Sequence, residues 1–196
     1  RSKGSKSNAW WTPIETFEML CKLYKFKPNL DAAASKRSTL CDVFLDRKTD
    51  ALKVSWKLQG RKSRVWLNPP NNKEKRGKKT RALLSLFIQK AYLEFTSGHA
   101  KIMMIVPLNT QSSVKSWWPF VQAPMERGED IMFRPIKSRI AFQKNGVKNT
   151  DSSINGYCVV LFGFNKKKVM KRLKIKQKQY YKIYYNLKKS LLRFLF

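Results

Sequence analysis

The segment Asn68-Pro69-Pro70-Asn71 contains residue types that are suited to binding a planar amino group. The side chain of Asn68 offers a carbonyl oxygen, and the rigid Pro69-Pro70 unit can hold the main-chain carbonyl of Pro69 in place. An exocyclic amine is a poor nucleophile because its lone pair is delocalised into the ring, and two acceptors at its N–H groups favour tetrahedral nitrogen. The motif therefore predicts group transfer to such an amine without a metal or a strong base. As an isolated tripeptide it also fits an ordinary turn.

Four aspartates lie upstream of this motif, in a chain with only 12 acidic residues: Asp31, Asp42, Asp46 and Asp50. Asp31 is expected where a short strand ends and the small-residue turn Ala32–Ser35 begins, which is the edge where open α/β sheets bind ligands. It is a candidate for binding the ammonium of a methionine-type donor with a sulfonium leaving group. Asp42 or Asp50 could accept from the donor's ribose hydroxyls or adenine amino group. Asp46 fits a solvated turn better, and Asp50 suits a turn cap equally well.

The chain is strongly basic, with 42 Lys and Arg residues and a net charge of +30. A field of this sign attracts polyanions, so nucleic acid is the first candidate partner and an anionic membrane surface the second. We expect no membrane span, because no stretch reaches the roughly 18 apolar residues that a span needs. The three scattered cysteines and the single histidine, His99, indicate no metal site and favour a reducing compartment such as the cytoplasm.

Alternating helical and apolar strand-like segments predict a three-layer α/β/α fold with a mostly parallel sheet. Thr12 is expected to cap a helix whose first residue is Pro13. The other expected elements are a short strand running into a turn at 29–34, a short apolar run at 64–67, a mobile basic loop at 72–80, a helix at 82–95, a strand at 101–108, two strand-like pieces within 130–142 around Pro135, and a strand at 157–164.

Both ends of the chain differ in composition from its centre. Residues 1–9 form a basic segment that we expect to be disordered, and residues 10–165 form the expected catalytic domain. Residues 166–196 lack acidic residues, and a helical stripe runs from Leu173 to Leu195. This tail is interpreted as a basic amphipathic helix that binds nucleic acid or an anionic membrane, or alternatively one that docks on the core.

Short segments between Trp10 and Phe164 occur in an order and spacing more specific than any one of them. They are Trp11-Thr12-Pro13, Leu30–Ser35, Cys41, Asp50-Ala51-Leu52, Trp56, Trp66–Pro70, Met103–Pro107, Phe133, Ser138–Phe142 and Val159–Phe162. In this order the chain resembles the phage-type DNA N6-adenine methyltransferases, the Dam-like family.

The resemblance implies a Rossmann-like fold that uses S-adenosyl-L-methionine to methylate the N6 amine of adenine in DNA. The base would be flipped out of a duplex or presented in a single strand. The implied catalytic residues are Asn68, Pro69, Pro70 and Asn71. The implied donor-binding residues are Trp11, Thr12, Pro13, Asp31, Ala33 and Asp50. The candidate DNA-binding residues are Lys73, Lys75, Arg76, Lys78, Lys79 and Arg139. A phage, virus or mobile-element origin follows from the family alone.

Two positions depart from the family pattern. Asn71 stands where the family usually has Tyr or Phe, whose ring stacks on the target base, and Ser138 replaces the usual Gly before Arg139. Stacking on an aromatic ring contributes about 1–3 kcal/mol per base. Trp117 and Trp118 are candidate replacement rings, although core packing suits them better. Asn71 leaves open a weakened enzyme or an inactive DNA-binding relative, and the same chemistry could serve cytosine N4 or adenine in RNA.

Overall fold

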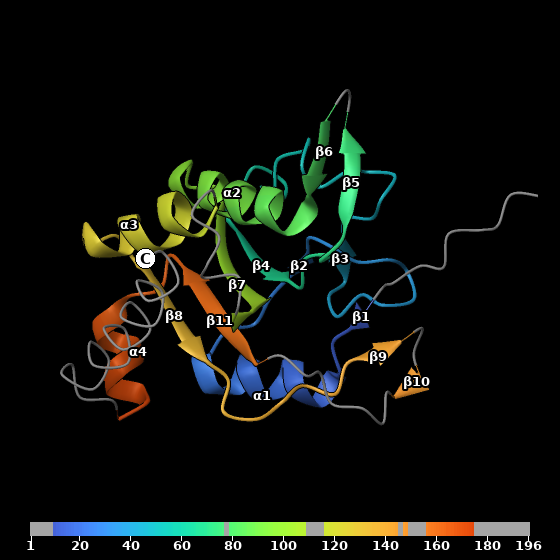
Figure 1. Cartoon of the computed structure of the whole chain (residues 1–196). Coiled ribbons are helices and arrows are strands. Elements are labelled where there is room, and N and C mark those ends of the chain that lie inside the picture. The colour runs from blue at the N-terminus through green and yellow to red at the C-terminus, as the bar shows by residue number, and fades with distance from the viewer. Residues whose placement is uncertain (1–9, 77–78, 109–115, 145–146, 149–155, 175–196) are drawn as a thin grey trace, which may run out of the picture.

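A mixed β-sheet lies between two layers of helices (Figure 1). The computed structural model describes residues 10–76, 79–108, 116–144, 147–148 and 156–174. Helices α2 (Leu83–Thr96) and α3 (Ala123–Glu126) cover one face of the sheet, and α1 (Ile14–Tyr24) and α4 (Lys166–Arg172) lie on the other. A short π-helix, η2 (Trp118–Gln122), leads into α3. The α/β fold predicted from the sequence is confirmed.

The central sheet has six strands within the described residues, in the order β3-β2-β4-β7-β11-β8. The first four pair in parallel, whereas β11 pairs antiparallel with both of its neighbours. Their bounds are β2 (Leu30–Asp31), β3 (Val43–Phe44), β4 (Ser63–Leu67), β7 (Ala100–Pro107), β8 (Ile131–Pro135) and β11 (Tyr157–Phe162). The sheet is therefore mostly parallel, with an antiparallel edge, and is Rossmann-like.

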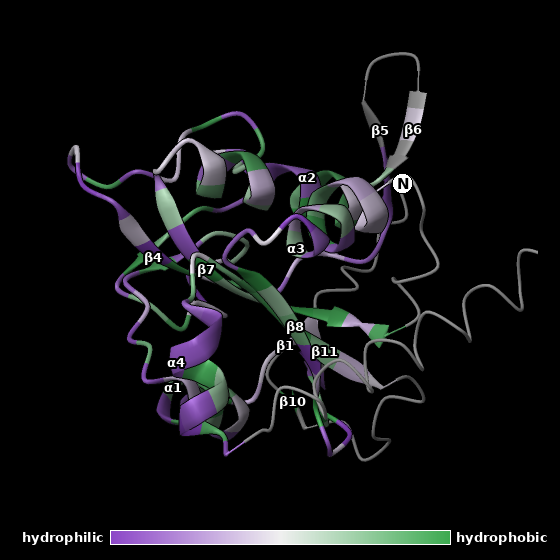
Figure 2. Cartoon of the chain, turned by 90° about the vertical axis from the view of Figure 1, so that its left-hand side faces the viewer, coloured by the Kyte–Doolittle hydropathy of each residue, from purple (hydrophilic) through white to green (hydrophobic). Residues whose placement is uncertain are grey.

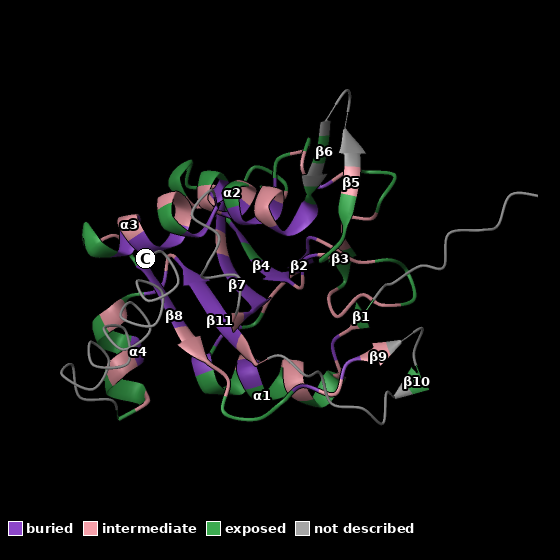
Figure 3. Ribbon diagram, viewed as in Figure 1, coloured by how far each residue is buried: buried purple, intermediate pink, exposed green. Residues whose placement is uncertain are grey.

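The central strands form the core because helices cover them on both faces. Strand β7 is buried at every position except Lys101, and β11 at every position except Tyr157. Figure 2 shows hydrophobic residues concentrated in these strands, and Figure 3 shows the same strands as the buried centre of the molecule. The ring of Trp66 in β4 meets Phe17 of α1 edge-on at 5.0 Å, which fixes α1 against the sheet.

The predicted start of the first helix is wrong by one residue. Pro13 is the N-cap, with φ −57° and ψ 139°, and Ile14 is the first helical residue. The fixed φ of proline suits an extended conformation as well as a helical one. Because Pro13 takes the extended one, Thr12 lies one residue outside the helix, and its side chain makes no capping bond.

The predicted basic loop at 72–80 is instead a hairpin of β5 (Lys73–Arg76) and β6 (Lys79–Ala82). It projects from the body of the protein above α2 (Figure 1). The sequence did not reveal it because charged strands show no apolar alternation, and backbone pairing alone defines them. Residues 77–78, and with them the predicted DNA contact Lys78, lie outside the described residues.

The second strand-like piece expected after Pro135 is not a strand. Residues 136–142 run without regular structure into β9 (Gln143–Lys144), which pairs with both β10 (Val147–Lys148) and β1 (Trp10–Trp11). The small sheet brings the start of the described chain beside residues far along the sequence. Sequence patterns miss such two-residue strands because they are too short to show a period.

The beginning of the predicted C-terminal helix is present as α4. The Asn165 side chain accepts a hydrogen bond from the Lys168 amide and caps the helix, Val169 is buried, and Arg172 donates to the carbonyl of Tyr24 at 2.7 Å. These contacts dock α4 beside the end of α1. The rest of the tail, from residue 175, and the N-terminal residues 1–9 lie outside the described residues. No helix in the described part is long and apolar enough to cross a membrane.

Candidate active site

A cavity of about 780 Å³ opens beside the carboxyl ends of β2 and β4. Strand β2 ends at Asp31, and β4 ends one residue before Asn68, so the sheet itself brings the two predicted ends of the site together. The predicted residues that line this cavity are Trp11, Thr12, Asp31, Ala33, Asp50, Asn68, Pro69, Pro70, Asn71 and Lys73. Most of the predicted donor-binding residues and all of the predicted catalytic residues therefore border one space.

The side-chain amide of Asn68 has a fixed orientation. Its Nδ2 donates a hydrogen bond to the main-chain carbonyl of Trp10 at 3.0 Å. Since the nitrogen is occupied by this bond, Oδ1 is the atom left to accept from a ligand. Strand β1 is in turn held by its pairing with β9. The next residue, Pro69, is buried and also lines the cavity.

Asp31 is a buried carboxylate that lines the cavity. Only 3% of its surface is exposed. Its two oxygens accept from the amides of Ala33 at 3.3 Å and Leu40 at 3.2 Å. Burial raises the pKa of Asp31 to about 6, and these two hydrogen bonds oppose the shift. A cation bound in the cavity would compensate for the buried charge.

The hydroxyl of Thr12 is buried without a hydrogen-bond partner among the described residues. The residue is 6% exposed and lines the same cavity as Asp31. A buried hydroxyl without a partner costs about 1–3 kcal/mol. Such a group at the wall of a cavity is a candidate for binding a ligand.

Asp50 lies on a tight loop beside Asp31. It adopts a left-handed conformation with φ 50°, which is favourable for Asp compared with most residues. Its carboxylate accepts from the Leu52 amide at 3.3 Å and lies 3.7 Å from the ammonium of Lys53. The indole of Trp56 donates to the carbonyl of Ala51 at 2.9 Å and holds the following turn in place.

The two other upstream aspartates have different surroundings. Asp46 forms the turn expected for it, because its carboxylate accepts from the amides of Lys48 and Thr49, yet it also lines the cavity. Asp42 is exposed and is not part of the cavity lining. Of the two alternatives for contacting the ribose or adenine, the structure places Asp50 at the cavity and Asp42 away from it.

Several predicted residues lie away from the cavity lining. Pro13 is at the start of α1, and Arg139 is exposed on the segment before β9. The backbones of Lys75, Arg76 and Lys79 belong to the hairpin, but their side chains are outside the description. Trp117 is buried against Phe133 at 5.2 Å, and Trp118 is exposed outside the cavity, so neither ring borders Asn71.

Sequence reasoning missed several cavity residues. Phe142 and Tyr157 form one wall, with ring centroids 4.8 Å apart, and Trp10 forms another. Glu74, at the base of the hairpin, also lines the cavity and forms a 3.4 Å ion pair with Arg47. No pattern in the sequence places them together, although Phe142 lies in a segment that carried the family resemblance.

The family described as "DNA N-6-adenine-methyltransferase (Dam)" matches residues 1–184. The chain belongs to the Dam family. A relative from this family, the DNA N-6-adenine-methyltransferase of Escherichia phage T1, is 32% identical over 104 residues. The match covers 53% of this chain, which spans only 37% of the length of that curated relative.

The Dam-family cavity is lined by two kinds of polar group. Asn68 contributes an amide oxygen, and Asp31 and Thr12 contribute a buried carboxylate and a partnerless hydroxyl. The amide oxygen can accept from an amine, whereas the carboxylate and the hydroxyl can bind the charged groups of an amino acid. Among the described residues, no cluster of three or more His, Cys, Asp or Glu side chains could hold a metal ion.

Proposed function

We propose that this protein methylates the N6 amine of adenine in DNA with S-adenosyl-L-methionine as the donor. The observation that carries the proposal is that Asn68 and Asp31 line one cavity, with the Asn68 amide oriented by the carbonyl of Trp10. Membership of the Dam family supports the same chemistry.

The part of the cavity lined by Asp31 and Thr12 fits an amino-acid donor. The Asp31 carboxylate would bind the donor's ammonium, and the Thr12 hydroxyl would donate to its carboxylate. Ala33 leaves room for close approach to the backbone, and Asp50 would accept from the ribose hydroxyls. The partnerless Thr12 hydroxyl and the buried Asp31 charge are both features that this ligand would satisfy.

The part of the cavity lined by Asn68 and Pro69 would hold the target amine. Oδ1 of Asn68 and the main-chain oxygen of Pro69 would accept hydrogen bonds from its two N–H groups, which localises the nitrogen lone pair toward the donor. S-adenosyl-L-methionine, when bound, supplies a methyl group on a positively charged sulfur that leaves as a neutral thioether. Transfer would form the new N–C bond as the S–C bond breaks, and the amine would lose one proton to water.

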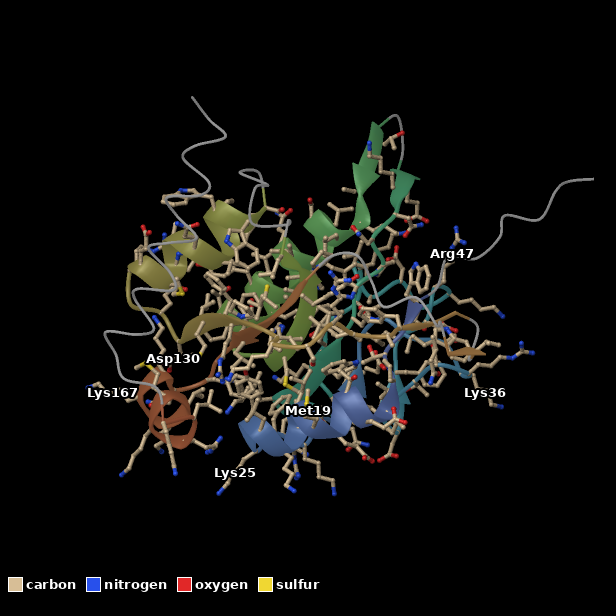
Figure 4. All side chains as sticks on the ribbon, turned by 60° about the horizontal axis from the view of Figure 1, so that its bottom comes forward. Met19, Lys25, Lys36, Arg47, Asp130 and Lys167 are labelled. Carbon is tan, nitrogen blue, oxygen red and sulfur yellow. The ribbon has the colours of Figure 1, made fainter. Side chains whose placement is uncertain are left out.

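DNA is the proposed substrate, as a duplex with a flipped base or as a single strand. The net charge of +30 attracts the phosphate backbone at long range. The labelled side chains of Lys25, Lys36 and Lys167 point away from the body of the protein (Figure 4). The hairpin follows directly after Asn71 and Asn72, and we propose that its basic residues contact phosphates beside an extruded base.

The substitution Asn68→Ala tests the proposal. We expect at least about a 100-fold loss of methyl transfer from labelled donor to DNA, because an acceptor for the reacting amine is removed. Donor affinity, measured by calorimetry, should stay close to that of the wild type because the proposed donor contacts are made by Asp31, Thr12 and Asp50. Methyl transfer at the wild-type rate would refute the assignment of Asn68.

A further inference from the structure

The fourth position of the motif lacks the ring that would cover a target base. Asn71 is exposed at the cavity, and its short amide offers no apolar face. A flipped base has two large flat faces that must be taken out of water or left exposed. Another ring near Asn68 in the cavity would restore this contact.

Six aromatic side chains line the cavity among the described residues: Trp10, Trp11, Trp66, Phe87, Phe142 and Tyr157. Three are already packed in the core, since Trp66 is 1% exposed, Phe142 4% and Phe87 7%. Trp11 and Tyr157 are half-buried. Trp10 is 45% exposed, the most of these six side chains, and its ring can offer a face to an incoming base.

Trp10 is also hydrogen-bonded to Asn68, the residue proposed to bind the target amine. Its carbonyl accepts the hydrogen bond from Nδ2 of Asn68 at 3.0 Å. Strand pairing with Lys144 on the other side holds the backbone of Trp10 in register. The backbone that carries the ring is therefore held beside Asn68, whose Oδ1 would bind the target amine.

We propose that Trp10 stacks on the target base and replaces the ring that Asn71 does not supply. This inference rests on the proposed function and specifies how the base is held. Stacking is tolerant of base identity because every base has a π-face. The choice of amine then falls to the acceptors of Asn68 and Pro69, while Trp10 contributes affinity.

Binding of short single-stranded oligonucleotides tests this role in the full-length chain. One oligonucleotide contains adenines, and its partner has abasic sites at those positions. The wild type should bind the adenine form more tightly, and Trp10→Ala should reduce this preference by about 5- to 150-fold. Trp10→Phe should retain part of it. Trp118→Ala is the matched control, because Trp118 is 42% exposed but lies outside the cavity.

Two further readouts separate stacking from a general structural effect. Adenine oligonucleotides should quench tryptophan fluorescence in the wild type and in Trp118→Phe, and much less in Trp10→Phe. Donor affinity should be unchanged in Trp10→Ala, since the truncation leaves the proposed donor-binding groups of Asp31 and Asp50 in place.

The possible outcomes distinguish this proposal from the proposed function. An adenine preference that survives in Trp10→Ala, or that is missing in the wild type, overturns the role of Trp10. Neither result bears on the proposal that the protein transfers a methyl group. A preference that is lost in Trp10→Ala but kept in Trp118→Ala, in a protein that transfers no methyl group, supports the role of Trp10 and refutes the proposed function.

Discussion

Under the proposed function, the buried carboxyl of Asp31 would couple donor binding to pH. Its pKa is raised to about 6, so above that pH the buried negative charge lowers the stability of the free protein. Below the ordinary pKa of 3.8 the carboxyl is protonated in the folded and unfolded states alike, and this cost is absent. A bound ammonium favours the ionised form, so binding releases a proton. We predict that donor affinity, measured by calorimetry, is constant above about pH 7 and falls as pH decreases through 6, approaching tenfold per pH unit.

Asp31→Asn provides the control for this dependence. The amide keeps the size of the side chain but does not titrate, so donor affinity should be weak and nearly independent of pH between 5 and 7. A wild-type affinity without a pH dependence in that range would contradict the pairing of Asp31 with the donor's ammonium.

Thr12→Val removes the partnerless hydroxyl and keeps the shape of the side chain. The unliganded variant should be more stable than the wild type by about 1 kcal/mol, because a buried hydroxyl without a partner is replaced by a methyl group. Its donor affinity should fall about 2- to 10-fold through loss of one neutral hydrogen bond. Thermal unfolding and calorimetry measure the two effects.

Thr12→Ser keeps the hydroxyl and should preserve most of the donor affinity. A Thr12→Val protein that is destabilised, or that binds the donor as well as the wild type does, would show that the hydroxyl does not serve the ligand.

At the scale of single residues, the sequence predicted the location of Asp31 and Asn68 better than their surroundings. Their place at one cavity was predictable because both lie at the carboxyl ends of strands, where open α/β sheets bind ligands. The burial that raises the pKa of Asp31 depends on packing from several segments, which no local pattern contains. Trp10 was missed because its place beside Asn68 follows from a contact across 58 positions of the chain.

Helix α2 fixes the loop that carries Asp50 through a buried carboxylate. Glu94, which is 4% exposed, accepts from Lys90 at 2.6 Å and from the Trp56 amide at 3.0 Å. Trp56 in turn donates to Ala51, next to Asp50. Burial opposes ionisation of Glu94, but these hydrogen bonds outweigh it and lower the pKa of its carboxyl. The carboxylate therefore contributes stability above the ordinary pKa of about 4.5, and this contribution is lost in acid.

Glu94→Ala should lower the free energy of unfolding by about 2–4 kcal/mol at neutral pH. The substitution leaves the Lys90 ammonium and the Trp56 amide without their partner in a nearly dry environment. Urea denaturation measures the loss. Glu18→Ala, on the exposed side of α1, is the control and should stay within about 0.5 kcal/mol of the wild type. Equal stability of the two variants would refute this role of Glu94.

At the scale of elements, long apolar segments were predicted correctly and short polar ones were not. The continuous apolar run of β7 and the periodic face of α2 are strong local signals because each buries a whole side of an element. The β5–β6 hairpin and the small sheet of β1, β9 and β10 depend on backbone pairing between distant or charged segments. Their sequences lack the pattern that burial imposes.

Across the whole molecule, the parallel sheet converts sequence order into a site. Asp31 and Asn68 are 37 positions apart, yet β2 and β4 are neighbours whose carboxyl ends meet at one edge. The small sheet then adds Trp10 at the same edge. The fold class was predictable from the alternation of elements, and the donor and amine ends were predictable from this edge rule. The cavity walls, which come from four or more segments, required the structure.

Nucleoside analysis of treated DNA tests the central claim most directly. DNA of varied sequence is incubated with the protein and isotopically labelled S-adenosyl-L-methionine, then digested and analysed by mass spectrometry. We predict labelled N6-methyladenine with the wild type and none above background with Asn68→Ala. Label in N4-methylcytosine alone, or no labelled nucleoside from a folded protein that binds the donor, would contradict the account.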